Sequence, residues 1–524
     1  MGEPIRLACD VLVIGGGMAA AWAAIAAAEA GAHVAMVDKG YCGTSGVTAT
    51  GGPNHWWVPE DPALRAQAIA RQSSKAQGLA DEAWMEQILA LTFRHLPTLA
   101  PWYPFGSDGA GGIYHSGVRG PEYMRALRSF ALARGVTILD HHPALELLAD
   151  REARVSGARG HALRHDAPWD IRAGATILAT GGCAFRSGLI GSALNTGDGY
   201  LMGAEAGAEL SGMEFSIAFS LSPAWASTRT LPFTAARFFD EAGHEIDVPS
   251  PRAGHAHHQA LGRAMLAGPV YADLSEAPAA LPPILHRIQP LTTASFARAG
   301  IDPFRQRFPV RLFGEGTIRG TGGLRILDQE CRTSVAGLFA AGDAATRELV
   351  AGAASGGGAV NSAWALSSGR IAGEAAAREA RPIRPDSALT GLGRAGLHPT
   401  AEARALDQRG LAASIESHMH HYDRALFRRR ASLSASLDTL GCHWDFIAAH
   451  GQATGAAALP LRELAAMAAT ARWCTAAALA RDETRGVHVR IDAPDLAPSR
   501  GHRLIVGGLD TVRLRPDVLL EDAA

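Results

Sequence analysis

The sequence predicts an α/β protein, and three observations near the N-terminus lead to this fold class. Residues 11–14 form a short apolar run that is typical of a buried strand, and the alanine-rich residues 18–30 are typical of a helix. A second apolar run follows and ends at Asp38. A strand, a helix and a second strand in this order indicate a parallel βαβ unit.

The glycines between the first strand and the helix have the spacing of a dinucleotide-binding turn. Gly15, Gly17 and Ala20 match the pattern G-x-G-x-x-A. The first glycine permits a tight turn, the second leaves room for a pyrophosphate, and the small third residue lets helix and strand lie close. The helix N-terminus attracts phosphate, and Asp38 is placed to accept hydrogen bonds from a ribose. We therefore predict a Rossmann-like domain that binds a dinucleotide.

Composition and charge narrow the class of protein. The chain has 524 residues, of which 47% are hydrophobic, so we expect about two to four domains with large cores. A net charge of −2 and a pI near 6.9 argue against a surface for nucleic acid or anionic membrane. The glycine-broken N-terminus does not resemble a secretory signal, and no stretch reaches about 18 uninterrupted apolar residues. We expect a cytoplasmic protein without membrane insertion.

Cysteine and histidine spacing gives no reason to expect a metal site. The six cysteines are scattered without C-x-x-C spacing, so any iron–sulfur relay is expected on another polypeptide. The runs "HAHH" (255–258) and "HMHHYD" (418–423) lack the ligand pattern of a metal centre. We expect the first run to begin a helix with exposed rings, and the second to lie on a solvated helical face.

The segments that follow Asp38 favour a flavin over a nicotinamide. A nicotinamide-binding domain would continue into another helix and strand, whereas this chain reads "KGYCGTSGVTATGGPNHWW", whose small residues suit a bulky planar ring. Farther along, residues 176–182 form an apolar strand that ends in Gly-Gly, and "AGLFAAGD" runs a strand into Asp343. A carboxylate in that position can accept a hydrogen bond from the ribityl chain of FAD.

The chain contains several short motifs and a longer C-terminal segment that are informative when taken together. They are "VIGGGMAAAWAA", "ATGG", "NTGDG", "GMEF", "GTGGLRI", "AGLFAAGD" and residues 463–494. Together they resemble the flavoprotein subunits of succinate dehydrogenase and fumarate reductase, with their relatives aspartate oxidase and the adenylylsulfate reductase flavoprotein. The resemblance covers most of the chain and implies an FAD-dependent oxidoreductase.

The same resemblance implies a domain organisation. An α/β, Rossmann-like FAD-binding domain would use residues 1–215 and 320–378, with an α+β capping domain inserted over residues 216–319. A C-terminal helical region with an extended tail would span residues 379–524. Within the cap we expect a hairpin that turns near residues 241–244 and a helix near residues 257–266.

The expected cofactor-binding residues come from the glycine turn, the end of the second strand, the glycine-rich segment and later turns. They are Gly15, Gly17, Met18, Ala19, Ala20, Asp38, Lys39, Ser45, Gly51, Gly52, Ala179, Thr180, Gly181, Asn195, Thr196, Asp198, Gly342, Asp343, Asn361 and Ser362. Covalent members of the family carry FAD on a histidine where this chain has Ser45, so the resemblance implies noncovalent FAD.

Four further departures from the family concern the substrate. In the succinate and fumarate enzymes an arginine of "S-R-D-x-V-x-R" delivers the proton. If Arg263 is the second arginine of that pattern, His258 occupies the position of the first. Ile318, beside Arg319, replaces a histidine, and Ser355 replaces an arginine that binds dicarboxylate. After "MEF" the family continues toward Phe-His-Pro-Thr, whereas this chain reads "SIAFSLSPAW". We therefore expect a small organic substrate other than fumarate, succinate or aspartate.

The catalytic candidates are His258, Arg263, His55 and Arg319. A histidine can give or take a proton near neutral pH, so His258 is the candidate acid or base, with an ordinary surface or core histidine as the alternative. His55 follows the glycine-rich segment and is a candidate for lining the substrate cavity. The alternative is that "NHWW" packs in the core. Arg319 flanks the expected cleft, as do Arg229, Arg237 and Arg311.

Two other functions remain open. One is a flavoprotein resembling that of adenylylsulfate reductase, which would work with a ferredoxin-like iron–sulfur partner. The other is a flavin electron carrier without substrate turnover, although an inserted lid argues against an exposed flavin edge. As the electron acceptor, the resemblance favours a separate iron–sulfur protein, with oxygen as the alternative.

Overall fold

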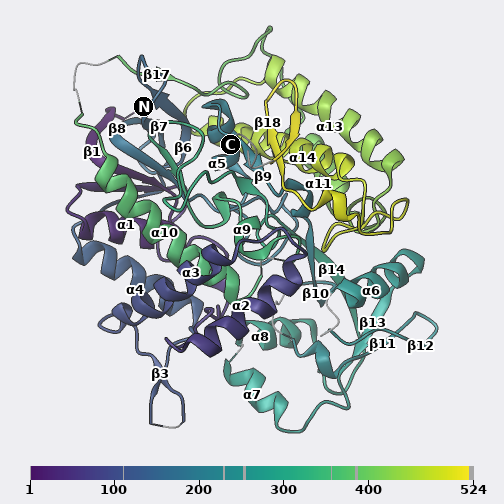
Figure 1. The fold of residues 1–524 in the computed structure, drawn as a ribbon. Coiled ribbons are helices and arrows are strands. Elements are labelled where there is room, and N and C mark those ends of the chain that lie inside the picture. Colours follow the sequence, from purple (N-terminus) through teal and green to yellow (C-terminus); the bar gives the residue numbers. More distant parts are fainter. Residues whose placement is uncertain are drawn as a thin grey trace.

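The predicted βαβ unit lies within a mixed sheet whose strand order is β17-β6-β7-β8-β1-β2-β5, with β16 also paired to β8 (Figure 1). The computed structural model describes residues 2–109, 111–227, 231–251, 255–288, 290–355, 357–383 and 388–517. Strands β16, β8, β1, β2 and β5 pair in parallel, and β7, β6 and β17 continue the sheet in antiparallel fashion. The strands are β1 (Ile5–Ile14), β2 (Val34–Asp38), β5 (Thr137–Asp140), β6 (Ala144–Ala149), β7 (Val155–Ala162), β8 (Ala167–Leu178), β16 (Leu338–Ala340) and β17 (Thr390–Gly391).

Small residues let two helices of this domain lie very close together. Helix α1 (Met18–Glu29) packs along α10 (Ala359–Glu379), and both are largely buried. A Cβ atom at Gly369 would lie 2.5 Å from the carbonyl oxygen of Ala19, and one at Gly373 would lie 2.2 Å from that of Ala23. The alanine-rich sequence of α1 therefore reflects close helix packing as well as helix propensity.

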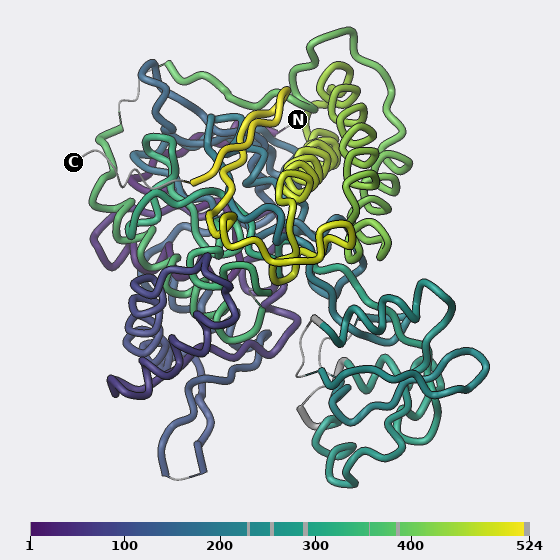
Figure 2. Tube along the Cα trace, turned by 45° about the vertical axis from the view of Figure 1, so that its right-hand side comes forward, coloured from purple at the N-terminus to yellow at the C-terminus, as the bar shows by residue number. Residues whose placement is uncertain are grey.

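The segment between the two parts of this domain forms a separate antiparallel sheet, of order β10-β14-β13-β11-β12, which we call the cap. Figure 2 shows the cap, in teal, to one side of the rest of the chain. The predicted hairpin is present: β11 pairs with β12, and Gly243 in the turn has a φ of +88°. The cap elements are β10 (Ala218–Pro223), β11 (Arg237–Phe239), β12 (Glu245–Ile246), α6 (His255–Ala267), β13 (Val270–Asp273), α7 (Leu281–Ile288), α8 (Pro290–Ala299) and β14 (Phe308–Gly316).

The C-terminal region combines helices with a strand pair that returns to the first domain. Helix α14 (Ala458–Ala480) is buried over most of its length, and β18 of the tail pairs with β9. The other elements here are α11 (Gln408–His420), α12 (Tyr422–Ala425), α13 (Arg430–His450), β18 (Leu504–Gly507) and β19 (Arg513–Pro516).

Other helices and strands lie within and between these units. They are α2 (Pro62–Ala76), α3 (Glu82–His95), β3 (Gly106–Ser107), β4 (Ile113–Tyr114), α4 (Gly120–Ala133), α5 (Asp198–Glu205), β9 (Leu210–Ser211), η3 (Met213–Phe215), η4 (Phe233–Ala235), β15 (Gly323–Leu324) and α9 (Glu348–Ala351). Among the described residues, no helix has the length and apolar character needed to cross a membrane.

Candidate functional site

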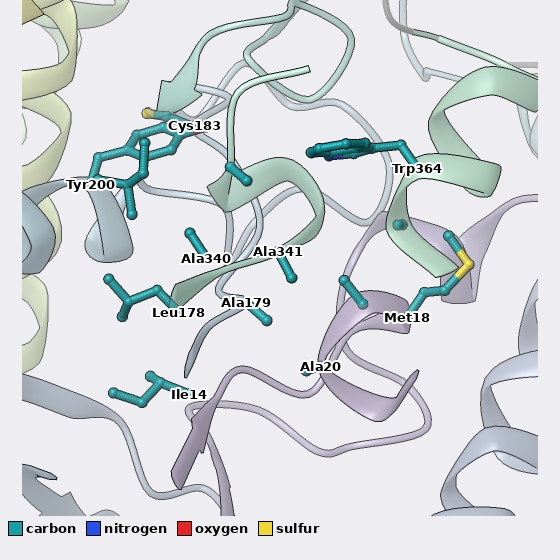
Figure 3. Close-up of a cluster of buried hydrophobic side chains, with 14 of the residues drawn as sticks. Ile14, Met18, Ala20, Leu178, Ala179, Cys183, Tyr200, Ala340, Ala341 and Trp364 are labelled. Atoms are coloured by element: carbon teal, nitrogen blue, oxygen red, sulfur yellow. The ribbon is translucent and has the colours of Figure 1, made fainter. Parts of the chain in front are cut away.

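A cavity of about 310 Å³ opens at the carboxyl ends of the parallel strands. Figure 3 shows the apolar side chains that gather at this edge, with Ile14, Ala179 and Ala341 near the start of α1. Ligands of open α/β sheets bind at this edge, where the loops from neighbouring strands meet.

The glycine turn after β1 forms one wall of the cavity. Gly15 has a φ of +128°, and a Cβ atom there would lie 2.2 Å from the carbonyl oxygen of Ala179. A Cβ at Gly16 would lie 2.2 Å from Oδ2 of Asp38, whereas one at Gly17 would meet nothing within 4 Å. Gly15 and Gly16 thus permit close packing, and Gly17 leaves open space for a ligand at the start of α1.

Several buried oxygens at the cavity lack a partner within the described part of the chain. They are Oδ2 of Asp38, Oδ1 of Asn195 and Oδ1 of Asn361. Burial raises the pKa of Asp38, and a hydrogen bond from Ser45 opposes this effect. Unsatisfied buried acceptors are costly, so this set fits a ligand with several hydroxyl or amide donors, such as FAD.

Lys39 connects this wall to the C-terminal region. Its Nζ donates hydrogen bonds to Oγ1 of Thr196 at 2.8 Å, Oδ2 of Asp198 at 2.6 Å and Oε1 of Glu463 at 2.8 Å. Burial opposes the charged form, but the carboxylates of Asp198 and Glu463 outweigh it and raise the pKa of Lys39. The ammonium therefore holds α14 against the cavity wall.

Most of the predicted cofactor-binding residues line this cavity. The exceptions are Ala20, which is buried in α1, and Thr196, which does not reach the cavity and accepts a hydrogen bond from Lys39. Sequence reasoning missed further lining residues: Ile14, Gly16, Val37, Gly46, Val47, Thr48, Pro53, Asn54, Pro143, Ala144, Leu194, Met202, Ile318, Gly358 and Ala365. Pro143 follows β5, which pairs beside β2, so strand order was the signal that could have identified it.

A second cavity, of about 340 Å³, lies between the cap, the first domain and the C-terminal region. From the cap it is lined by residues of β10, η4 and α6, including His258. Ser355 contributes from the first domain, and Leu426 and Val487 contribute from the C-terminal region. Arg319 lines both cavities.

Arg319 is held in place by several neighbours. Its Nε forms an ion pair with Oε2 of the fully buried Glu315 at 3.0 Å, and its carbonyl accepts from Oγ of Ser355 at 3.1 Å. A Cβ atom at Gly357 would lie 2.8 Å from Cδ of Arg319, so glycine leaves room for the arginine. Arg347 supports the same turn by donating to the carbonyl of Ile318 at 3.0 Å.

The histidines of α6 differ in their surroundings. His258 and His257 both line the second cavity, and their ring centroids are 5.5 Å apart. The ring of His257 is buried rather than exposed: its Nδ1 donates to the carbonyl of Pro249 at 2.7 Å, and burial lowers its pKa. Among the described residues, no group of three or more His, Cys, Asp or Glu side chains has the arrangement of a metal site.

Two other catalytic candidates lie away from both cavities. Arg263 is exposed, with its guanidinium 5.2 Å from the ring of Phe427, because five residues along a helix turn a side chain well away from His258. His55 is buried, with Nε2 3.2 Å from the hydroxyl of Tyr123, and burial lowers its pKa to about 4. Its neighbour Asn54 lines the first cavity instead.

The second histidine run and the other arginines expected near the cleft have separate surroundings. His420 does not lie on a solvated face: it is half-buried, and its Nε2 donates to the carbonyl of Ala184 at 3.0 Å because α11 packs against the cap strand at Gly314. Arg237 pairs with Glu276 at 3.0 Å, and Arg311 lies over the ring of Phe313. Arg229 lies outside the described residues.

Comparisons with known proteins agree with this geometry. The family model described as "FAD binding domain" matches residues 10–361, and the model described as "Fumarate reductase flavoprotein C-term" matches residues 422–504. The L-aspartate oxidase of Mycobacterium tuberculosis is 30% identical, over 97% of each chain. One subunit of the fumarate reductase (CoM/CoB) of Methanothermobacter marburgensis is 27% identical, over 94% of this chain and 95% of that one.

Solved structures share the fold at lower identity. The E. coli quinol fumarate reductase flavoprotein superposes with a TM-score of 0.82 at 20% identity, over 99% of this chain and 98% of that one. Adenylylsulfate reductase from Archaeoglobus fulgidus superposes with a TM-score of 0.76 at 19% identity, over 99% and 97%. The chain therefore belongs to the fumarate reductase and succinate dehydrogenase flavoprotein superfamily of FAD-dependent oxidoreductases.

Proposed function

We propose that this FAD-dependent oxidoreductase transforms an organic substrate, other than a simple C4 dicarboxylate, in the second cavity. The observation that carries the proposal is the position of Arg319, which lines both the cavity that fits FAD and the cavity under the cap. A molecule in the second cavity would therefore lie next to the cofactor. The cap can exclude water from the reacting atoms.

The first cavity would hold FAD through residues with separate roles. The start of α1 beside Gly17 suits the pyrophosphate, Asp38 suits the adenosine ribose, and Asp343 suits the ribityl chain. Ser45 lines the cavity where covalent relatives have histidine, and it supports noncovalent binding. When bound, FAD would supply two-electron redox chemistry.

His258 is the group we assign to proton transfer. Imidazole exchanges a proton near neutral pH, whereas the guanidinium of Arg319 stays charged and suits binding of an oxygen atom of the substrate. Glu315 orients this guanidinium from the buried side. The side chains of His258 and Arg319 both belong to the wall that a substrate would contact.

The wall of the second cavity does not favour a dicarboxylate. Among its described lining residues, Arg319 supplies the guanidinium, and Ser355 stands where the family places an arginine. Ile318, which lines the neighbouring first cavity, stands where the family places a histidine. Two carboxylates need converging cationic donors. L-aspartate remains the second candidate, because the M. tuberculosis relative is an L-aspartate oxidase.

Acid precipitation of the purified flavoprotein should leave FAD in the supernatant, since Ser45 offers no histidine for a covalent link.

The substrate is tested by anaerobic reduction of the same flavoprotein. Candidate donors, including L-aspartate and succinate, are then mixed with the holoprotein, and bleaching of the flavin is followed; fumarate is tested in reverse with a viologen donor. Rapid turnover of fumarate, succinate or L-aspartate would contradict the proposal.

A matched pair of variants tests the role of His258 with a substrate from that panel. His258→Gln should lower kcat by roughly 100-fold or more, because general acid–base catalysis contributes about that much. His244→Gln, in the exposed turn of the cap hairpin, should leave kcat unchanged. Equal rates for the two variants would remove His258 from the mechanism.

The electron acceptor is a separate question. We propose a separate iron–sulfur protein of the ferredoxin type, with oxygen as the alternative, because the six cysteines include no cluster motif. The fold is shared with adenylylsulfate reductase, which keeps a function of that kind open. The cap over the second cavity argues against a simple electron carrier, which needs an exposed flavin edge.

A further inference from the structure

We infer that the substrate is a mainly apolar molecule with one oxygen-bearing head, either a carbonyl or a single carboxylate. This inference rests on the proposed function, because it takes the second cavity as the substrate site. The head would lie at Arg319 beside His258, and the apolar body would lie against the cap.

The walls of the cavity support an apolar body. Its lining includes Phe219 and Leu221 of β10, Leu231 and Phe233 beside η4, and Leu426 and Val487 from the C-terminal region. Each of these side chains remains 7–9% exposed, whereas nearby core residues such as Phe215 and Leu261 have no exposed surface. Because these residues line the cavity, an apolar ligand there can remove exposed apolar area from water.

The polar groups of the cavity differ in kind. Besides Arg319 and His258 they are Ser220, Thr234, His257, Gln259 and Ser355. Arg319 lies where the two cavities meet, and its ion pair with Glu315 leaves little net positive charge there. A second carboxylate on the substrate would lie against phenylalanine and leucine side chains, which cannot replace its hydration. A single carboxylate or a carbonyl needs only the donors at Arg319 and avoids this cost.

Ser220 adds a second polar point within the apolar wall. Ser220 lines the cavity from β10, and its buried Oγ has no hydrogen-bond partner within the described structure. Such a hydroxyl can donate to a ligand oxygen or accept from a ligand hydroxyl. An apolar body with one more polar group along its length would therefore fit this wall.

Isothermal titration calorimetry on the holoprotein tests the substrate class without measuring turnover. The probes are straight-chain monocarboxylates from butanoate to decanoate, the methyl ketones of matching length, succinate and L-aspartate. Affinity should rise about two- to fourfold for each added methylene, and the heat capacity of binding should be negative. The carboxylate and ketone series distinguish a charged from a neutral head.

Two variants and one control variant locate the binding site. Leu221→Asn should remove most of the gain in affinity per methylene, whereas Leu327→Asn, at a side chain that is 50% exposed and outside both cavities, should not. Arg319→Gln should weaken binding of the head at every chain length without changing the gain per methylene. FAD content and thermal stability of each variant exclude a folding defect.

The possible failures are distinct. Tighter binding of succinate or L-aspartate than of the longer monocarboxylates and ketones, or no dependence on chain length, would overturn the apolar substrate class while leaving an oxidoreductase site intact. A chain that takes up no FAD would contradict the proposed function before any substrate is tested.

Discussion

Asp343 illustrates how one residue serves both the cofactor cavity and its surroundings. Its side chain lines the first cavity and forms an ion pair with Arg347, whose guanidinium is almost fully buried. Arg347 in turn donates to the carbonyl of Ile318 and so supports the turn that carries Arg319. Removing the carboxylate therefore affects FAD binding and leaves a buried charge without its partner.

Two substitutions at Asp343 are expected to separate these effects. Asp343→Ala should weaken FAD binding by about 1.5–3 kcal/mol, roughly tenfold or more in Kd, because a charge-assisted hydrogen bond is lost. Asp343→Asn keeps the shape and should cause a smaller loss. FAD affinity is measured by fluorescence titration of the apoprotein, whose thermal stability is recorded separately. Asp328→Asn, in an exposed ion pair with Arg332, is the control. Unchanged FAD affinity in Asp343→Ala would remove this residue from the site.

At the scale of elements, the entry to the cap is fixed by buried charges. Glu214 of η3, just before β10, accepts from Nε of Arg481 at 2.7 Å. Arg481 also pairs with Glu483 at 2.9 Å, in the segment that follows α14. Glu348 of α9 lies beside this group, and burial, aided by the charge of Glu214, raises its pKa to about 8.

The raised pKa of Glu348 predicts how stability changes with pH. Below its ordinary pKa of 4.5 the group is protonated in both folded and unfolded chains. Between pH 4.5 and 8 only the folded chain keeps the proton, so this contribution to stability is lost as pH rises. The loss should be on the order of a few kcal/mol, since each pKa unit corresponds to about 1.4 kcal/mol.

Melting temperatures from pH 5.5 to 8.5 would test this prediction. Glu348→Gln keeps a neutral side chain and should flatten the decrease, whereas Glu86→Gln, on the exposed face of α3, should retain the wild-type slope. Parallel curves for wild type and Glu348→Gln would show that Glu348 does not carry the effect.

At the scale of the whole molecule, the second cavity exists only where three parts of the chain meet. The cap supplies His258 and Arg319, the first domain supplies Ser355, and the segment after α14 supplies Val487. In the proposed function, a substrate between these parts would limit direct access to the flavin. We therefore expect the route of electrons out of the protein to depend on how the three parts pack together.

The behaviour of the reduced flavin toward oxygen tests this route. We expect slow reoxidation when air is admitted to the anaerobically reduced protein, and fast reoxidation when an oxidised ferredoxin-like protein is added. Stopped-flow absorbance and a peroxide assay follow the two reactions. Reoxidation by air within about a second, with stoichiometric hydrogen peroxide, would instead identify an oxidase.

The sequence by itself determined the α/β class and most of the cofactor cavity, because those features depend on short segments. The turn at Gly15 and the acid at Asp38 belong to one βαβ unit of about 30 residues, in which local geometry already specifies the contacts. Gly16 was overlooked, since its need for a hydrogen side chain arises from the position of the Asp38 carboxylate.

Only the tertiary structure decided which side chains share the second cavity. His55 follows the glycine-rich segment but turns into the core toward Tyr123, and Arg263 shares a helix with His258 but points elsewhere. Arg319 and Val487, far apart in the sequence, line one wall. Packing of the cap and the C-terminal region onto the first domain sets these neighbours, and no pattern of local spacing contains that information.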